Sequence, residues 1–332
     1  METLTHDSRL LADNPLGDPA RRTIGVYLPP GYDGKRRFPT VTVLTGFTGT
    51  GMSLLNSTPW EPNLATRMDR LITDGKARPA ILIMPDCFTR YGGSQYADSP
   101  ALGRYQSYIV DEIVPAVEAQ FRCIAAPEGR AVVGKSSGGH GALSLVMDRP
   151  GVFSAAGSHA GDAAFATSYS RDFPSVLLQL EKRGGIAGFL TWFEAQVTKP
   201  SSSIEVMSHL CCAAAWSPTT GPYGFGQGFE LPFKPHTGEL VPEVFARWLA
   251  FDPVERVADP AVQGHLGALR ALYLDAGRSD EYFLQLGARQ LSARLTAANI
   301  PHLYEEFDGG HRGIQHRYDR SLAVLTEALA RA

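Results

Sequence analysis

Residues 130–147 read RAVVGKSSGGHGALSLVM and contain the only G-x-S-x-G pattern of the chain, with Ser136 at its centre. The apolar run before this pattern is typical of a buried strand, and the stretch from Gly139 to Met147 can form a helix. A serine at such a strand–turn–helix junction, which is called a nucleophile elbow, is held in a strained conformation that exposes its hydroxyl, and glycine fits the crowded positions around it. The alternative interpretation is a glycine-rich turn that happens to contain a serine.

A serine nucleophile needs a histidine base and an acid that orients the imidazole. His311 follows two glycines directly after a strand predicted at 303–307, so we predict that it is the base. We predict Asp280 as the acid, because it lies across the turn that follows a strand predicted at 271–275. Asp275 closes that strand and is better explained by hydrogen bonds to turn amides, and Glu281 is a third candidate.

Acyl transfer through a serine also needs two backbone amides that stabilise the oxyanion. We predict that one is the amide of Ser137, which follows the candidate nucleophile, and that the other is the amide of Phe47 in the loop after a strand predicted at 40–44. Read otherwise, the second loop is a Gly/Thr turn with one aromatic residue.

Strand and helix signals alternate through most of the chain, which predicts a doubly wound, mostly parallel α/β sheet with helices on both faces. The predicted strands are 22–28, 40–44, 80–85, 130–133, 153–158, 271–275 and 303–307, and the predicted helices are 64–73, 108–118, 139–147, 282–298 and 316–331.

The stretch 163–250 interrupts the alternation and is rich in aromatic residues. We predict a lid or cap inserted over the carboxyl edge of the sheet, with residues 1–162 and 251–332 forming the core. Trp216 and Phe225 of this insertion are predicted to line a substrate pocket. The alternative is an ordinary helical subdomain with its own small core.

Composition excludes several classes of function. The chain has 332 residues, 44% of them hydrophobic, and a net charge of −3, which does not favour binding to nucleic acid or to an anionic membrane. Its four cysteines show no metal-binding spacing, so we expect no metal. We expect no cofactor either, because the predicted residues supply the nucleophile, the base and the oxyanion donors themselves. No apolar run is long enough to span a bilayer, and the first residues lack a basic start followed by an apolar stretch, which predicts a cytoplasmic protein.

Several motifs, taken in order, resemble those of the esterase D-like group of α/β-hydrolases. This group includes S-formylglutathione hydrolases, enterochelin esterases, feruloyl and acetylxylan esterases, and mycolyltransferases. The motifs are Val26-Tyr27-Leu28-Pro29-Pro30-Gly31-Tyr32, Thr45-Gly46-Phe47-Thr48-Gly49, Ile83-Met84-Pro85-Asp86, Ser94-Gln95-Tyr96, Gly134-Lys135-Ser136-Ser137-Gly138-Gly139, Gly277-Arg278-Ser279-Asp280 and Gly309-Gly310-His311.

The resemblance implies an α/β-hydrolase fold, with Ser136, Asp280 and His311 as nucleophile, acid and base. It further implies hydrolysis of a small-molecule carboxylic ester through an acyl-enzyme, and it allows a homodimer. The long insertion departs from a plain S-formylglutathione hydrolase. An acyltransferase with the same triad and a catalytically silent binding protein are the alternative functions.

Further substrate contacts are predicted for Tyr96 and Phe88, and for His159, which together with Asp162 follows the strand after the elbow. The alternative for His159 and Asp162 is a polar loop that fixes the lid.

Overall fold

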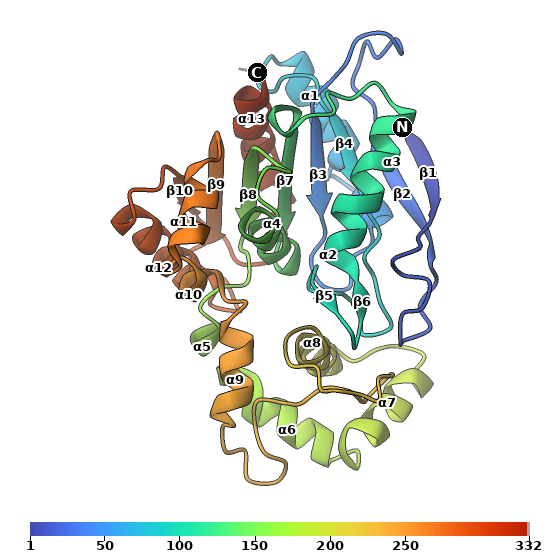
Figure 1. The fold of residues 1–332 in the computed structure, drawn as a ribbon, viewed down its shortest axis with the longest axis vertical. Helices are drawn as coiled ribbons and strands as arrows, with labels where there is room; N and C mark the ends of the chain where they lie inside the picture. Colours follow the sequence, from blue (N-terminus) through green and yellow to red (C-terminus); the bar gives the residue numbers. More distant parts are fainter. Residues whose placement is uncertain (331–332) are drawn as a thin grey trace.

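The computed structural model describes residues 1–330, and its centre is a twisted sheet of eight strands (Figure 1). The strands lie in the order β1-β2-β4-β3-β7-β8-β9-β10, and those from β4 to β10 in this order run parallel. β2 is antiparallel to both of its neighbours. The strand bounds are β1 Glu2–Asp7, β2 Arg21–Tyr27, β3 Thr40–Leu44, β4 Ile81–Met84, β7 Arg130–Lys135, β8 Ala155–His159, β9 Ala271–Gly277 and β10 Leu303–Phe307, and a separate hairpin joins β5 Asp98–Ser99 to β6 Gly103–Arg104.

Helices cover both faces of the sheet because the buried strands are apolar on both faces. Val41 and Val43 of β3 pack into one apolar cluster with residues of α1 and α13, whereas Leu44 packs into a second cluster with α3, α4 and α12. The helices of the core are α1 Leu64–Thr73, α2 Tyr105–Ser107, α3 Val114–Gln120, α4 Ser137–Asp148, α10 Pro253–Arg256, α11 Pro260–Gly267, α12 Leu284–Ala297 and α13 Tyr318–Leu329, and a π-helical segment, Tyr108–Ile113, joins α2 to α3.

Five further helices form a separate layer, which we call the cap, beyond the carboxyl ends of the parallel strands (Figure 1). They are α5 Phe165–Ser168, α6 Phe173–Glu181, α7 Gly185–Ala195, α8 Ser201–Trp216 and α9 Pro242–Leu249. The cap has its own apolar core, in which the rings of Phe165, Tyr169, Trp216 and Trp248 contact one another. The carboxyl edge of the sheet therefore faces the cap.

Most predicted elements agree with the structure to within a few residues, and the predicted strands 40–44 and 303–307 agree with β3 and β10 at both ends. Several elements were not predicted, among them β1, a mostly polar strand at the edge of the sheet with Leu4 as its apolar residue, the short β5–β6 hairpin, and the helices α10 and α11. The last helix was predicted to reach Arg331, which lies outside the described residues, as does the final residue of the predicted core.

Candidate active site

Ser136 is the single residue between the last residue of β7 and the first residue of α4. Because the chain turns from strand to helix within one residue, Ser136 adopts a φ of 58° and a ψ of −127°, a combination that L-residues rarely adopt. Its amide donates to the carbonyl of His159 on β8 at 2.9 Å, and its carbonyl accepts from the amide of His140 at 3.0 Å. These two bonds hold the strained residue in place.

The glycines around Ser136 are required by close packing. A Cβ on Gly134 would lie 2.2 Å from the carbonyl oxygen of Gly138, and a Cβ on Gly138 would lie 2.5 Å from the carbonyl oxygens of Leu44 and Thr45. Both positions exclude any side chain, which explains the G-x-S-x-G pattern in this chain.

The structure brings His311 and Asp280 into contact. The Nδ1 atom of His311 lies 2.8 Å from Oδ2 of Asp280, and both side chains are buried. The ring of Tyr282 packs edge-on against the imidazole, with 4.9 Å between ring centroids. Ser136 and His311 line the same cavity, although no hydrogen bond joins the Ser136 hydroxyl to the imidazole in the described part of the chain. Such bonds are often long before a substrate binds.

Glu281, the third candidate for the acid, holds the histidine loop instead of the imidazole. Its Oε2 accepts a hydrogen bond from the backbone amide of His311 at 2.6 Å, and this bond lowers the pKa of the Glu281 carboxyl. The loop also needs its glycines: a Cβ on Gly310 would lie 2.8 Å from the Glu281 carboxylate, and a Cβ on Gly277 would lie 2.4 Å from the carbonyl oxygen of Gly309.

The predicted oxyanion loop passes directly over Ser136, since a Cβ on Gly46 would lie 3.3 Å from the Cβ of Ser136. The amide of Thr48 is used by the carbonyl of Gly92 at 2.7 Å, whereas the amide of Phe47 has no acceptor among residues 1–330. The amide of Ser137, the first residue of α4, is likewise free, as expected at a helix N-terminus. Two unpaired backbone donors therefore flank Ser136.

These groups open onto a cavity of about 890 Å³ between the carboxyl edge of the sheet and the cap. The wall on the cap side is mostly polar and includes Ser168, Tyr169, Glu205 and His209. Burial lowers the pKa of His209, whose two ring nitrogens lie within hydrogen-bond distance of backbone carbonyls of Glu205 and Tyr169. The cap therefore presents a mostly polar surface to the cavity, and of its aromatic residues only Tyr169, among those described, both lines the cavity and belongs to the cap core.

Asp162, just beyond the end of β8, also lines this cavity. The hydroxyl of Tyr169 donates to its Oδ2 at 2.8 Å. The pKa of the Asp162 carboxyl is raised to about 6, because burial and the nearby Asp280 raise it more than Tyr169 and His311 lower it. Burial also lowers the pKa of Lys135, the residue directly before Ser136, which lines the same cavity.

None of the five predicted substrate contacts is among the residues that line the cavity. Trp216 lies in the cap core, stacked on Phe165, with 2% of its surface exposed. Phe225 packs on Tyr91 and beneath the Arg90 guanidinium. Apart from Tyr169, the aromatic rings of the insertion therefore cover one another instead of lining the cavity.

The other three predicted contacts are also placed elsewhere. Tyr96 is buried behind the oxyanion loop, where its hydroxyl donates to the carbonyl of Thr45 at 2.6 Å, and Phe88 is an exposed residue of another loop. His159 still belongs to β8 and points into the core, with Nδ1 2.8 Å from Asp275 and Nε2 2.8 Å from the Ser321 hydroxyl.

Asp275 has a different role from the predicted one, because side chains and not turn amides hold it. Its carboxylate contacts His159 and accepts hydrogen bonds from the Tyr273 hydroxyl and from Nε of Arg317 at 2.8 and 2.7 Å. Burial alone would raise the pKa of Asp275, but His159, Arg317 and Tyr273 together lower it. This buried network ties β8 and β9 to α13 behind Ser136.

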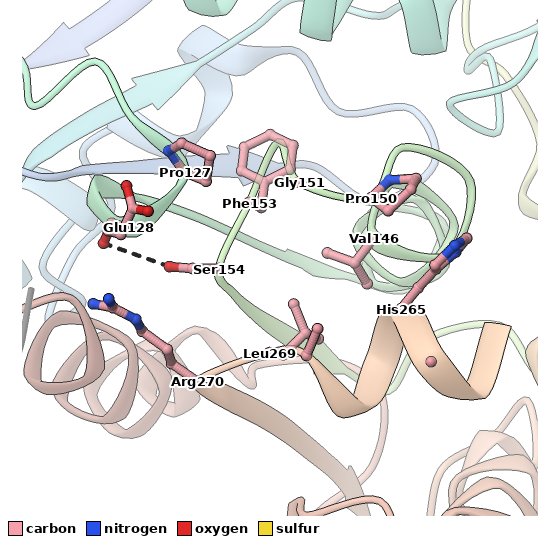
Figure 2. A pocket seen from close by; sticks show the side chains of 12 residues that line it. Pro127, Glu128, Val146, Pro150, Gly151, Phe153, Ser154, His265, Leu269 and Arg270 are labelled. Atoms are coloured by element: carbon pink, nitrogen blue, oxygen red, sulfur yellow. Dashed lines mark hydrogen bonds between the residues drawn. The ribbon is translucent and has the colours of Figure 1, made fainter. Parts of the chain in front are cut away.

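A second, smaller hollow of about 270 Å³ lies near the start of β8 and the end of α11 (Figure 2). Ser154 lines it and donates to the carbonyl of Glu128 at 3.4 Å. Because Ser154 precedes β8, whereas Ser136 follows β7, this hollow is at the opposite edge of the sheet from the candidate active site. None of its lining residues belongs to the predicted triad.

Residues 1–330 contain no cluster of three or more histidine, cysteine or acidic side chains that could hold a metal ion. None of their helices combines the length and apolar character that crossing a membrane requires.

Comparison with known proteins places these features in a family. The family model described as "Putative esterase" matches residues 19–322. Esterase Rv1288 of Mycobacterium tuberculosis is 33% identical over 142 residues, which make up 39% of this chain and 29% of that protein, so the match spans less than a third of the relative.

Solved structures show the same fold over nearly the whole chain. A ferulic acid esterase superposes with a TM-score of 0.63 at 19% identity, covering 98% of this chain and 97% of its own. An S-formylglutathione hydrolase from Agrobacterium tumefaciens superposes with a TM-score of 0.59 at 16% identity, covering 98% and 94%. The sheet order, the elbow and the family match together place the chain in this esterase family, with the α/β-hydrolase fold.

Proposed function

We propose that the protein is a serine carboxylesterase that works through an acyl-enzyme. The observation that carries the proposal is the convergence of three features on one cavity: the strained Ser136, the His311–Asp280 pair, and the unpaired amides of Phe47 and Ser137. Similarity to proteins named esterase and feruloyl esterase supports ester bonds as the target.

In the proposed reaction the Ser136 hydroxyl attacks the ester carbonyl, and its proton passes to Nε2 of His311. Asp280 keeps the imidazole oriented through Nδ1 and stabilises the imidazolium that forms. The negative charge on the former carbonyl oxygen is held by the two amides. The C–O bond then breaks, and the alcohol leaves with the proton from His311. Water attacks the acyl-enzyme with His311 again as the base, which releases the acid and restores Ser136.

The test is hydrolysis of p-nitrophenyl acetate and butyrate by the wild type and by Ser136→Ala, together with labelling by a fluorophosphonate probe. We expect the variant to lose at least about 1,000-fold in kcat/KM and all labelling, because removal of a triad nucleophile costs this much or more. Ser154→Ala is the matched control, since it removes a serine hydroxyl from the second hollow. Full activity in Ser136→Ala would overturn the proposal.

A further inference from the structure

The cavity between sheet and cap contains two hydrogen-bond acceptors that the protein leaves incompletely paired. The first is the carboxyl group of Asp162, which is 8% exposed. Within residues 1–330 it accepts one side-chain hydrogen bond, from Tyr169 to Oδ2. Oδ1 has no hydrogen-bond partner among these residues. The protein does not enclose this atom completely, so it is open to the cavity that Asp162 lines.

The second acceptor is the side-chain amide of Gln95, which is 2% exposed and lines the same cavity. Its Nε2 contacts the Cys212 thiol of α8 at 3.2 Å, and its Oε1 has no hydrogen-bond partner in the described part of the chain. A buried polar atom without a partner costs free energy. Oε1 is enclosed by the protein, whereas Gln95 as a residue lines the cavity, so a ligand group that enters beside Gln95 can pair with this atom.

The two acceptors belong to one wall of the cavity. Gln95 contacts Cys212, Cys212 interacts with the Tyr169 hydroxyl, and Tyr169 donates to Asp162. Gln95 has a φ of 50°, in the left-handed region, which strains its backbone. This strained residue is the one whose side chain forms part of the wall. Tyr169 uses its one proton on Asp162, so it cannot also donate to the Gln95 oxygen.

We propose that Asp162 and Gln95 form a substrate subsite that receives a hydrogen-bond donor, a hydroxyl or an ammonium group, carried by the ester. The inference rests on the proposed esterase function and narrows its substrate class. An ester with a purely hydrocarbon acyl and alcohol part leaves both acceptors unpaired. An ester with a suitably placed donor forms hydrogen bonds with them, and the hydrogen bond to the Asp162 carboxylate is charge-assisted.

Sets of esters that differ by one group test the proposal. Ethyl butyrate, ethyl 3-hydroxypropanoate and ethyl 3-aminopropanoate carry a methyl, a hydroxyl and an ammonium group at the same place in the acyl part. Propyl acetate and 2-hydroxyethyl acetate make the same exchange of methyl for hydroxyl in the alcohol part. Within each set, the ratio of the kcat/KM values of two esters is divided by the ratio of their alkaline hydrolysis rates, which removes differences in intrinsic reactivity. Comparing the two sets shows whether the acyl part or the alcohol part is recognised. Comparing the hydroxyl ester with the ammonium ester shows which donor is preferred.

The wild type should prefer a donor-bearing ester over its methyl counterpart by about tenfold or more in at least one comparison. Asp162→Ala and Gln95→Met should each reduce that preference severalfold, measured as the ratio of kcat/KM for the donor-bearing ester to kcat/KM for its methyl counterpart in the same variant. Gln95→Met removes only the amide and keeps the length of the side chain, so it remains informative if Asp162→Ala does not fold. Glu61→Gln is the matched control, because it removes a carboxylate from the exposed opposite rim of the cavity.

Two failures are distinguishable. If a fluorophosphonate labels Ser136 and the wild type shows no donor preference, or cleaves none of the five esters, the subsite is overturned and the proposed esterase chemistry stands. If the probe does not label Ser136, the proposed function fails. A donor preference that survives in both Asp162→Ala and Gln95→Met would also overturn the assignment to these two residues.

Discussion

Replacing Asp162 by asparagine should stabilise the protein at neutral pH. The asparagine oxygen can still accept the hydrogen bond from Tyr169, so the main change is the loss of a buried charge. Burial raises the pKa of this carboxyl from 3.8 to about 6, a shift of roughly two pH units. Each unit corresponds to about 1.4 kcal/mol, so the ionised carboxylate costs about 3 kcal/mol at pH 8.

The pH dependence follows from where each state releases the proton. The unfolded chain releases it near pH 3.8, whereas the folded protein keeps it until about pH 6. Between these values the folded state binds more protons, so the free energy of unfolding falls as the pH rises. The stabilisation by Asp162→Asn should therefore be close to zero below pH 3.8, about 1.6 kcal/mol at pH 5 and about 3 kcal/mol at pH 8.

Urea unfolding followed by tryptophan fluorescence at pH 5, 6.5 and 8 measures this dependence, since Trp216 and Trp248 are buried in the cap beside Asp162's partner Tyr169. Asp172→Asn is the control: it removes a charge from the same cavity, but its carboxylate is half-buried and paired with Arg171 at 3.2 Å. A gain that does not change with pH, or a loss of stability at pH 8, would refute the reasoning.

Two further substitutions test the backbone of the site and the core of the cap. Ser136→Gly should be more stable than Ser136→Ala by about 1 kcal/mol in the same unfolding assay, because the φ of 58° and ψ of −127° strain any residue with a Cβ; equal stability of the two variants would show that the elbow is not strained. Trp216→Ala should lower the free energy of unfolding by about 3–5 kcal/mol and leave ester selectivity unchanged, because the ring is buried in the cap core; a change of selectivity without loss of stability would place the ring in the substrate site.

The elements that position the proposed triad could be predicted because each is encoded locally. Ser136 is flanked by glycines that the tight turn requires. His311 follows Gly309 and Gly310, and the loop packs against Gly277, where a Cβ would meet the Gly309 carbonyl. Asp280 could be preferred over Asp275 as the acid from the predicted end of the strand alone. Asp275 lies within β9, whereas Asp280 lies beyond its end. Motif spacing and strand boundaries carry this information without any knowledge of long-range packing.

The surroundings of the triad depend on details that spacing does not provide. His159 and Asp162 are three residues apart and were predicted to lie together. His159 is the last residue of β8, and the pleat of the strand directs it towards α13. Asp162 follows the strand and reaches the cavity at the carboxyl edge. One strand boundary therefore separates a core residue from a cavity residue.

The cap shows the same effect along a helix. The cavity side of α8 contributes Ser201, Ile204, Glu205 and Ser208, at the i, i+3, i+4 and i+7 spacing of one helix face. In the sequence such a mostly polar stripe is typical of a face turned to water, and the aromatic residues nearby are the more obvious candidates for a binding pocket. Apolar burial explains the outcome: the cap must enclose its large rings to fold, which leaves its polar face for the cavity. We therefore expect the selectivity of the protein to depend on polar groups of the cavity, such as those of the proposed subsite at Asp162 and Gln95, and not on the aromatic residues of the cap core.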